Sequence, residues 1–420
     1  MYQISVLSNG IRVVSNYMPQ ATSASAFVFF NSGSRHETIA ESGISHFIEH
    51  MLFRGTTNRP SSQILCGEIE SIGGYINGGT DKDFTEFYAK VPADRFPMAV
   101  DVLSDMILNS RFDNEDMEKE RKVIGEEIAM CYDNHQEWCE VLIDSILWPD
   151  HALGRSVAGS VESISTFTSQ QLREYQKNHY GSSGTVFSVA GPLKHEETVC
   201  LAENLFADLP VASFLDTELY QARQSQSFIY EKRNSEQVHL TIAWPSVNRT
   251  DPRRHQIDML NTLLSGGTSG RLFSEIRDKQ GLVYTVESYQ MRHTESGAFA
   301  VYAATKNTTA SQTVAAIIGE LKKLAFENIP KDELNKAREL VRGRLILRAE
   351  STKSMASDYG AQLLLNDEIK DNQQVLKIVE SITTQDISEC AQWLINQKPK
   401  LSAVGSLLNE QEIKNQIDQL

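Results

Sequence analysis

Residues 42–53 read Ser-Gly-Ile-Ser-His-Phe-Ile-Glu-His-Met-Leu-Phe, and the fold must bring the partners of these residues to them. Its apolar residues recur with helical spacing, and Gly55 follows where such a helix would end. His46 and His50 are four positions apart on the predicted helix, so their imidazoles share one face and could bind one metal ion. Glu49 lies near the same face, where its carboxylate could reach a metal-bound water. The order inverts the zinc-binding pattern His-Glu-x-x-His.

A catalytic zinc site usually takes three protein ligands and leaves a fourth position for water, so a third ligand is required. Residues 118–128 read Glu-Lys-Glu-Arg-Lys-Val-Ile-Gly-Glu-Glu-Ile and offer the best candidates. Glu120 and Glu127 are two helical turns apart and therefore face the same way. Spacing alone does not choose between them. Without a third ligand, His46 and His50 could equally be partly buried helix residues, with Glu49 a solvated charge.

Length and composition restrict the class of protein. A chain of 420 residues exceeds what one hydrophobic core usually supports, which predicts at least two domains. The formal net charge of −15, with no cluster of Lys and Arg, argues against a nucleic-acid partner. No apolar run approaches the roughly 20 residues that cross a bilayer, and the first residues do not resemble a signal peptide. The five scattered cysteines contain no Cys-x-x-Cys pair. We therefore expect a cytoplasmic protein with no membrane partner.

An internal repeat predicts two homologous domains. The tetrapeptide Val-Glu-Ser-Ile begins at Val161 and again at Val379, and a helical pattern follows each copy. Next comes, in both places, an apolar strand that ends in glycine, at Gly191 and at Gly405, and then an acidic helix. The two offsets are nearly equal, which indicates a duplicated domain. We expect an N-terminal metal-binding domain at 1–212, a polar linker at 213–227 and a homologous C-terminal domain at 228–420.

The pattern of strands and helices predicts an α+β fold. Each half opens with strand-like runs, and Ser8-Asn9-Gly10 is a typical hairpin turn between the first two. Helical patterns follow the strands in both halves rather than alternating with them. Strands grouped in this way favour mainly antiparallel sheets packed with helices. The expected strands and helices are 4–7, 11–15, 24–30 and 238–243, and 43–53, 93–108, 114–131, 255–264 and 309–327, respectively.

The chain resembles the M16 peptidase family, also called the pitrilysin, insulinase or mitochondrial-processing-peptidase family, in its short two-domain form. In that family 76 residues separate the second histidine from the third zinc ligand, a Glu that ends the helical pattern Glu-Arg-x-x-x-x-x-Glu. Here 76 residues separate His50 from Glu127, and Glu120 and Arg121 open the matching helix. The resemblance therefore implies that His46, His50 and Glu127 hold Zn²⁺. Glu49 would be the general base, and Glu120 a carboxylate that orients a ligand.

The resemblance extends to segments that would bind a peptide substrate. Residues 73–80 read Gly-Gly-Tyr-Ile-Asn-Gly-Gly-Thr and look like the family's edge strand, to which an extended substrate adds through backbone hydrogen bonds. Asn77, Gly78 and Gly79 would contact the substrate there. The family usually has alanine at the position of Gly78, so glycine should loosen the strand and let another backbone come close. A plain Gly/Asn turn is the structural alternative.

The second half carries a further part of the implied site. Residues 265–284 look like the family's C-terminal signature, in which Arg277 and Tyr284 would bind the substrate backbone and stabilise the tetrahedral oxyanion. A surface Arg and a half-buried core Tyr are the alternative reading. Long relatives contain four such domains closed around a chamber, whereas this chain supplies two. The resemblance thus implies a homodimeric zinc endopeptidase that cuts peptides or unfolded segments. The alternative is a subunit of the same fold that lacks catalysis or requires a different partner.

Overall fold

The computed structural model describes residues 2–211 and 218–420, which pack as two units. Unit 1 comprises Met1–Ala129, Ser156–Glu218 and Leu347–Ile369, and unit 2 comprises Met130–Arg155, Leu219–Ile346 and Lys370–Leu420. Each unit contains one mainly antiparallel sheet with helices packed on it. The α+β fold expected from the sequence is therefore confirmed.

The sheet of unit 1 has the strand order β1-β2-β6-β3-β5-β4. All neighbours are antiparallel except β2 and β6, which run parallel. The predicted first hairpin is present, and Gly10 takes the positive φ of +94° that its turn requires. The strands are β1 (Tyr2–Val6), β2 (Arg12–Tyr17), β3 (Ser23–Phe30), β4 (Tyr75–Thr80), β5 (Thr85–Pro92) and β6 (Thr185–Gly191).

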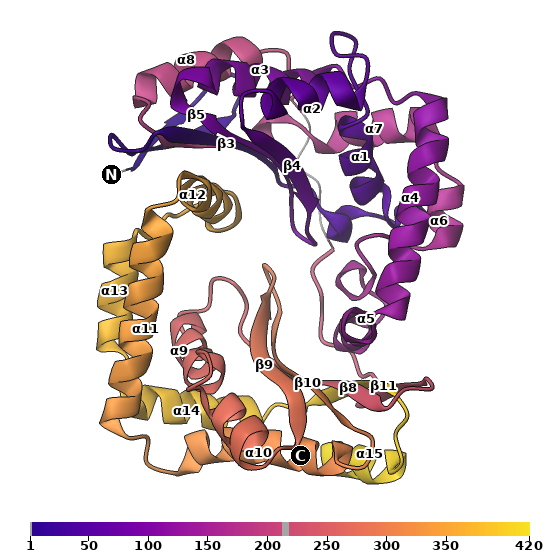
Figure 1. The fold of residues 1–420 in the computed structure, drawn as a ribbon, viewed down its shortest axis with the longest axis vertical. Helices are drawn as coiled ribbons and strands as arrows, with labels where there is room; N and C mark the ends of the chain where they lie inside the picture. The colour runs from indigo at the N-terminus through magenta and orange to yellow at the C-terminus, as the bar shows by residue number, and fades with distance from the viewer. Residues whose placement is uncertain (1, 212–217) are drawn as a thin grey trace. The chain divides into compact units, whose positions relative to one another are not determined.

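Helices bury both faces of this sheet, which explains the continuous apolar sequence of its central strand β3. Ala26 and Val28 point into the core shared with the helices that follow the strands in sequence, whereas Phe27 and Phe29 point toward α12 on the other face (Figure 1). Gly360 lets α12 approach closely, because a Cβ there would lie 2.2 Å from the Phe29 ring. The helices of unit 1 are α1 (Ile44–Leu52), α2 (Ser62–Glu70), α3 (Phe96–Leu108), α4 (Asn114–Asp133, its last turn in unit 2), α6 (Val161–Ser165), α7 (Ser169–His179), α8 (His195–Leu205) and α12 (Thr352–Asn366), with short 3₁₀ turns η1 (Ser34–His36), η2 (Ile39–Glu41), η3 (Ala93–Arg95) and η5 (Ser182–Gly184).

The sheet of unit 2 has the order β7-β11-β8-β10-β9, again with one parallel pair, β7 and β11. Leu240 and Ile242 of β8 point into the main core, and Ala243 points toward α5 on the other face. The elements of unit 2 are α5 (His135–Leu147), η4 (Ala152–Gly154), β7 (Phe228–Lys232), β8 (Gln237–Pro245), α9 (Arg254–Ser265), the π-helical η6 (Leu272–Lys279), β9 (Val283–Arg292), β10 (Gly297–Lys306), α10 (Ala310–Phe326), α11 (Lys331–Ala349, its last residues in unit 1), α13 (Asn372–Ser381), α14 (Thr384–Ile395), β11 (Lys400–Gly405) and α15 (Glu410–Asp418).

The two sheets share one topology, so the internal repeat is structural. Strands β2-β6-β3-β5-β4 correspond in order and direction to β7-β11-β8-β10-β9. The repeated sequences form equivalent elements: α7 and α14 both begin with a threonine capping box, and β6 and β11 both end in glycine. The chain thus consists of two homologous α+β halves.

The units are not continuous in sequence. Helix α5, from the first half of the chain, packs on β8 and β11 of unit 2, and α12, from the second half, packs on β3 and β6 of unit 1. The predicted division at 1–212 and 228–420 does not include this exchange of helices. Of the predicted linker 213–227, residues 213–217 lie outside the described residues, and 218–226 form no helix or strand. None of the helices in the described chain has both the length and the apolar character that a membrane crossing requires.

Candidate metal centre

Helix α1 is fixed at its beginning by a buried carboxylate. Gly43 precedes the helix with a φ of +93°, and its N–H donates to Glu37 at 2.8 Å. The N–H of Ser45 donates to the other oxygen of Glu37 at 2.9 Å. These bonds satisfy two of the free N–H groups at the helix start and place a negative charge at its positive end. Glu37 therefore fixes the start of α1 and, with it, the orientation of the polar face of the helix.

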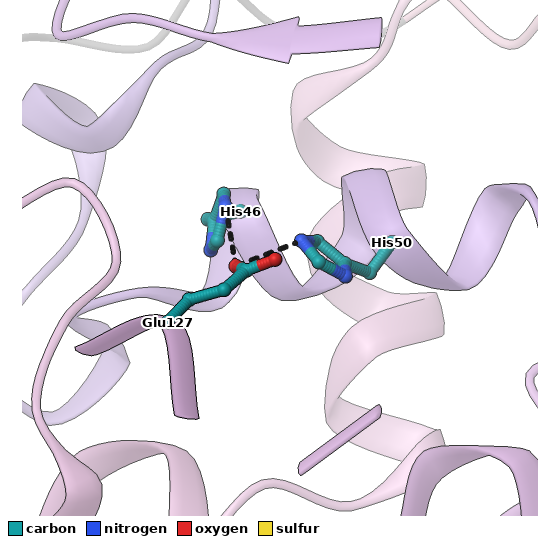
Figure 2. Close-up of side chains that lie close together, drawn as sticks. All are labelled: His46, His50 and Glu127. Atoms are coloured by element: carbon teal, nitrogen blue, oxygen red, sulfur yellow. Dashed lines mark ion pairs between the residues drawn. The ribbon is translucent and has the colours of Figure 1, made fainter. Parts of the chain in front are cut away.

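That face carries His46 and His50, and α4 brings Glu127 against them. The Oε2 of Glu127 lies 3.8 Å from the Nε2 of His46 and 3.4 Å from the Nε2 of His50. Figure 2 shows the carboxylate of Glu127 between the two imidazoles. One atom from each residue lies within 4.8 Å of the others, and no other such group of His, Cys, Asp or Glu occurs among the described residues. The structure thus brings together the three predicted zinc ligands.

Glu120 is also in the site, but it contacts the far side of His50. Its Oε2 lies 2.8 Å from the Nδ1 of His50, and Arg54 forms an ion pair with the same buried carboxylate. We assign the Nδ1 proton to this hydrogen bond, which leaves the Nε2 of His50 as the atom that can bind a metal ion. Glu120 therefore occupies the position expected of a residue that orients a ligand.

The chemistry of these donors fits a zinc ion. Burial, with a smaller contribution from His50, lowers the pKa of His46 to about 4, so its ring is neutral near pH 7. The Nε2 atoms of both imidazoles and one oxygen of Glu127 face one another. A divalent cation placed among them could take all three as ligands. Two His and one Glu form a donor set typical of catalytic zinc, with the fourth position left for water.

Glu49 is held beside this group by the edge strand β4. Thr80 donates its hydroxyl to the Oε2 of Glu49 at 2.6 Å. Burial raises the pKa of Glu49, and the Thr80 hydrogen bond opposes that shift. At Gly78 a Cβ would lie 3.0 Å from the Phe87 ring and 3.2 Å from the Cγ of Glu49. The glycine at this position therefore keeps space open next to Glu49.

The predicted edge strand is confirmed. Within the described residues, β4 pairs on one side with β5 and has no strand on its other side. Asn77 is exposed, and its side-chain oxygen accepts from the N–H of Gly78 at 2.9 Å. Asn77 and Gly79 share one face of the strand, and Gly78 lies on the face of Glu49, because side chains alternate along a strand. The backbone of β4 is thus available for a further strand.

Arg277 and Tyr284 belong to unit 2. Arg277 lies in η6, with its guanidinium 4.6 Å from the centre of the Phe273 ring. Tyr284 lies near the start of the edge strand β9, and 48% of its surface is exposed. π-Helical turns occur often at functional sites. The contribution of these two residues to the metal centre stays a prediction.

No role was predicted from the sequence for Glu37, Arg54 or Thr80. An acidic residue shortly before a helix start could have indicated Glu37. No local signal indicates Arg54 or Thr80, since their partners Glu120 and Glu49 come from other elements.

Two family models match the chain. Residues 12–161 match the one described as insulinase (peptidase family M16), and residues 166–341 match the one described as peptidase M16 inactive domain. An uncharacterized zinc protease of Streptomyces coelicolor is 32% identical over 97% of this chain and 90% of its own. The uncharacterized zinc protease YmxG of Bacillus subtilis is 31% identical over 94% of this chain and 96% of its own.

Solved structures agree on the fold. A protease from Helicobacter pylori superposes with a TM-score of 0.90 at 18% identity, covering 96% of this chain and 99% of its own. A peptidase M16 inactive domain from Pseudomonas fluorescens gives a TM-score of 0.89, also at 18% identity, covering 97% and 98%. At this identity the likeness concerns the fold alone.

Proposed function

Because the chain belongs to the M16 peptidase family, we propose that it is a zinc-dependent endopeptidase that hydrolyses peptides or unfolded segments. One observation carries the proposal: His46, His50 and Glu127 bring a ligand atom each within 4.8 Å of one another, with Glu49 on the same helix. The relatives named as zinc proteases support zinc as the metal.

His46, His50 and Glu127 would hold the zinc ion, and Glu120 would keep His50 in the right orientation. Zinc, when bound, supplies Lewis-acid polarisation of a water and of the scissile carbonyl. Glu49 takes the proton of the attacking water and later passes it to the leaving amine. Its raised pKa suits a group that must both accept and release a proton. Thr80 holds the carboxylate of Glu49 in place for both transfers.

The free edge of β4 would bind the substrate as an added strand, with contacts from Asn77, Gly78 and Gly79. Backbone hydrogen bonds hold a peptide with little regard to its sequence. Arg277 and Tyr284 would bind the substrate backbone and donate to the developing oxyanion.

We further propose a homodimer around a closed chamber, in which Arg277 and Tyr284 of one subunit complete the site of the other. A mixture of His50→Ala and Tyr284→Phe proteins should then recover activity that neither protein has alone. Absence of recovery in heterodimers verified by native mass spectrometry would count against shared sites.

The test of the function is Glu49→Gln. We expect zinc content equal to that of the wild type and a loss of roughly 10²–10⁴-fold in kcat on a quenched peptide library. Glu126→Gln, an exposed neighbour of Glu127, is the matched control and should keep both. An active, zinc-replete Glu49→Gln protein would refute the mechanism. A wild type that binds zinc but cuts nothing until another chain is added would favour the alternative of a partner-dependent subunit.

A further inference from the structure

Glu86 of β5 lies next to β4 and makes no side-chain hydrogen bond or close ion pair within the described residues, although Lys353 attracts it electrostatically. It stands opposite Gly79 in the β4–β5 register. A Cβ on Gly79 would lie 3.8 Å from the Cγ and 3.9 Å from the Oε1 of Glu86. The carboxylate of Glu86 therefore lies beside Gly79. Gly79 is the one residue on this face of β4 that has no side chain, so the carboxylate can be approached from the free edge of the strand.

Charges around Glu86 leave room for a cation. Asp81 and Glu49 add negative charge, and Lys353 of α12 is the nearby positive group. The Nζ of Lys353 donates to the Tyr88 hydroxyl at 2.8 Å and lies 4.3 Å from the centre of that ring. Burial raises the pKa of Glu86 to about 7; Lys353 opposes that rise, and Asp81 and Glu49 add to it.

Strand geometry fixes which residue of a bound peptide would meet Glu86. Adjacent strands are ~4.8 Å apart, so a peptide added to β4 would have its backbone about 10 Å from that of β5. The peptide residue opposite Gly79 would point its side chain to the face of Glu86, and its two neighbours would point to the face of Glu49. Only a long side chain can cross Gly79 to reach the carboxylate.

We propose that Glu86 is a specificity-determining residue that selects lysine or arginine at the peptide position opposite Gly79. The inference rests on the proposed peptidase function, because it assumes that the substrate adds to β4. Gly78 and Gly79 then serve different purposes on opposite faces: the first leaves space beside the general base, and the second opens a path to Glu86. A Lys or Arg that reaches Glu86 would form a partly buried charge-assisted hydrogen bond.

The first measurement is cleavage-site profiling of a proteome-derived peptide library by mass spectrometry. The wild type should enrich Lys and Arg at one fixed position relative to the cut, and Glu86→Gln should lower that enrichment about tenfold. Glu86→Lys should replace it by a preference for Asp and Glu at the same position. Glu70→Gln, which removes one exposed charge from the adjacent α2, should change nothing. No basic preference in the wild type, or one that persists in Glu86→Gln, would overturn the inference.

A second measurement does not depend on turnover. Fluorescein-labelled peptides of alternating Thr and Lys, or of alternating Thr and Gln, are titrated with the Glu49→Gln protein and followed by anisotropy. The Lys peptide should bind about tenfold more tightly, and adding Glu86→Gln but not Glu70→Gln should remove the difference. If both variants lost the preference for the Lys peptide equally, the preference would reflect the overall charge of the protein, and the proposed role of Glu86 would be wrong. A wild type that cleaves no peptide would refute the peptidase function, while this binding result would still decide the role of Glu86.

Discussion

Both units place the polar face of a helix against the edge strand of a similar sheet, α1 against β4 and α9 against β9. In unit 2 these polar groups bind one another: Asp258 accepts from Gln290 at 3.0 Å and from Arg292 at 2.8 Å, and Ser288 donates to Asn261 at 2.6 Å. In unit 1 the Nε2 atoms of His46 and His50 instead converge on one oxygen of Glu127, at 3.8 and 3.4 Å.

The two contacts show how the same fold can form either a packed polar interface or a candidate metal site. In unit 2 the polar groups of α9 and β9 bind one another. In unit 1 three ligand atoms face one another, as a metal ion requires. The predictions below test that contrast.

The largest effect should come from removing a zinc ligand in unit 1, whereas removing a histidine of α9 in unit 2 should have none. His50→Ala should lose zinc, because two protein ligands hold the ion poorly, and turnover should fall to that of chelator-treated protein. His255→Ala on α9 should keep zinc and activity, since His255 lies 3.7 Å from Asp258 and belongs to no metal-binding group. Metal analysis and peptide cleavage measure both. Full zinc content in His50→Ala would show that His50 is not a zinc ligand.

The next effect concerns what unit 2 contributes to the reaction. Tyr284→Phe should lower kcat by roughly 10²–10³-fold without changing zinc content, because it removes the proposed donor to the oxyanion. Tyr17→Phe is a matched control, as Tyr17 is 47% exposed and Tyr284 48%. Unchanged kcat in Tyr284→Phe would restrict the chemistry to unit 1.

A smaller effect is expected at the carboxylate behind His50. Glu120→Gln should weaken zinc affinity by about 10–100-fold, because His50 loses the charged partner of its Nδ1. Glu118→Gln, two residues earlier on the same helix and exposed, should leave the affinity unchanged. Competition with a chromogenic chelator gives the affinities. Equal affinities in the two variants would exclude an orienting role for Glu120.

The smallest effect should be at the corresponding polar contact of unit 2. Asp258→Ala should reduce the free energy of unfolding by about 1 kcal/mol, since Gln290 and Arg292 lose an acceptor that is itself partly exposed. Activity per folded molecule should not change. Denaturant titration and the specific activity of the folded fraction measure these quantities, and a catalytic loss would show that α9 does more than pack.

The sequence predicted those parts of the site that depend on local periodicity. The spacing of His46 and His50 within one helix was sufficient to place both imidazoles on one face. Glu127 could not be chosen over Glu120 by periodicity, because both are on the same face of α4, and the family resemblance decided between them. Contacts between residues of different elements could not be predicted from the sequence. The register of β4 and β5 and the place of α1 determine that Thr80 bonds to Glu49 and that Glu86 lies beside Gly79.

The fold was predictable to a similar degree. The expected strands and helices are present, and the repeat correctly indicated two homologous halves. The exchange of α5 and α12 was not predictable, because an amphipathic helix specifies that one face is buried but not which sheet buries it. Gly360 is the residue that fits α12 closely to Phe29, yet in sequence it is an ordinary glycine within a helix.

The place of α12 has a consequence for biosynthesis. The sheet that presents β4 to substrate is covered on one face by residues 352–366, which the ribosome makes long after Glu127. Until that segment emerges, the face of the sheet that carries Phe27 and Phe29 lacks its covering helix, and unit 1 cannot be complete. A nascent chain therefore contains every proposed zinc ligand well before it has the finished unit that holds them, since residue 366 is made 239 residues after Glu127.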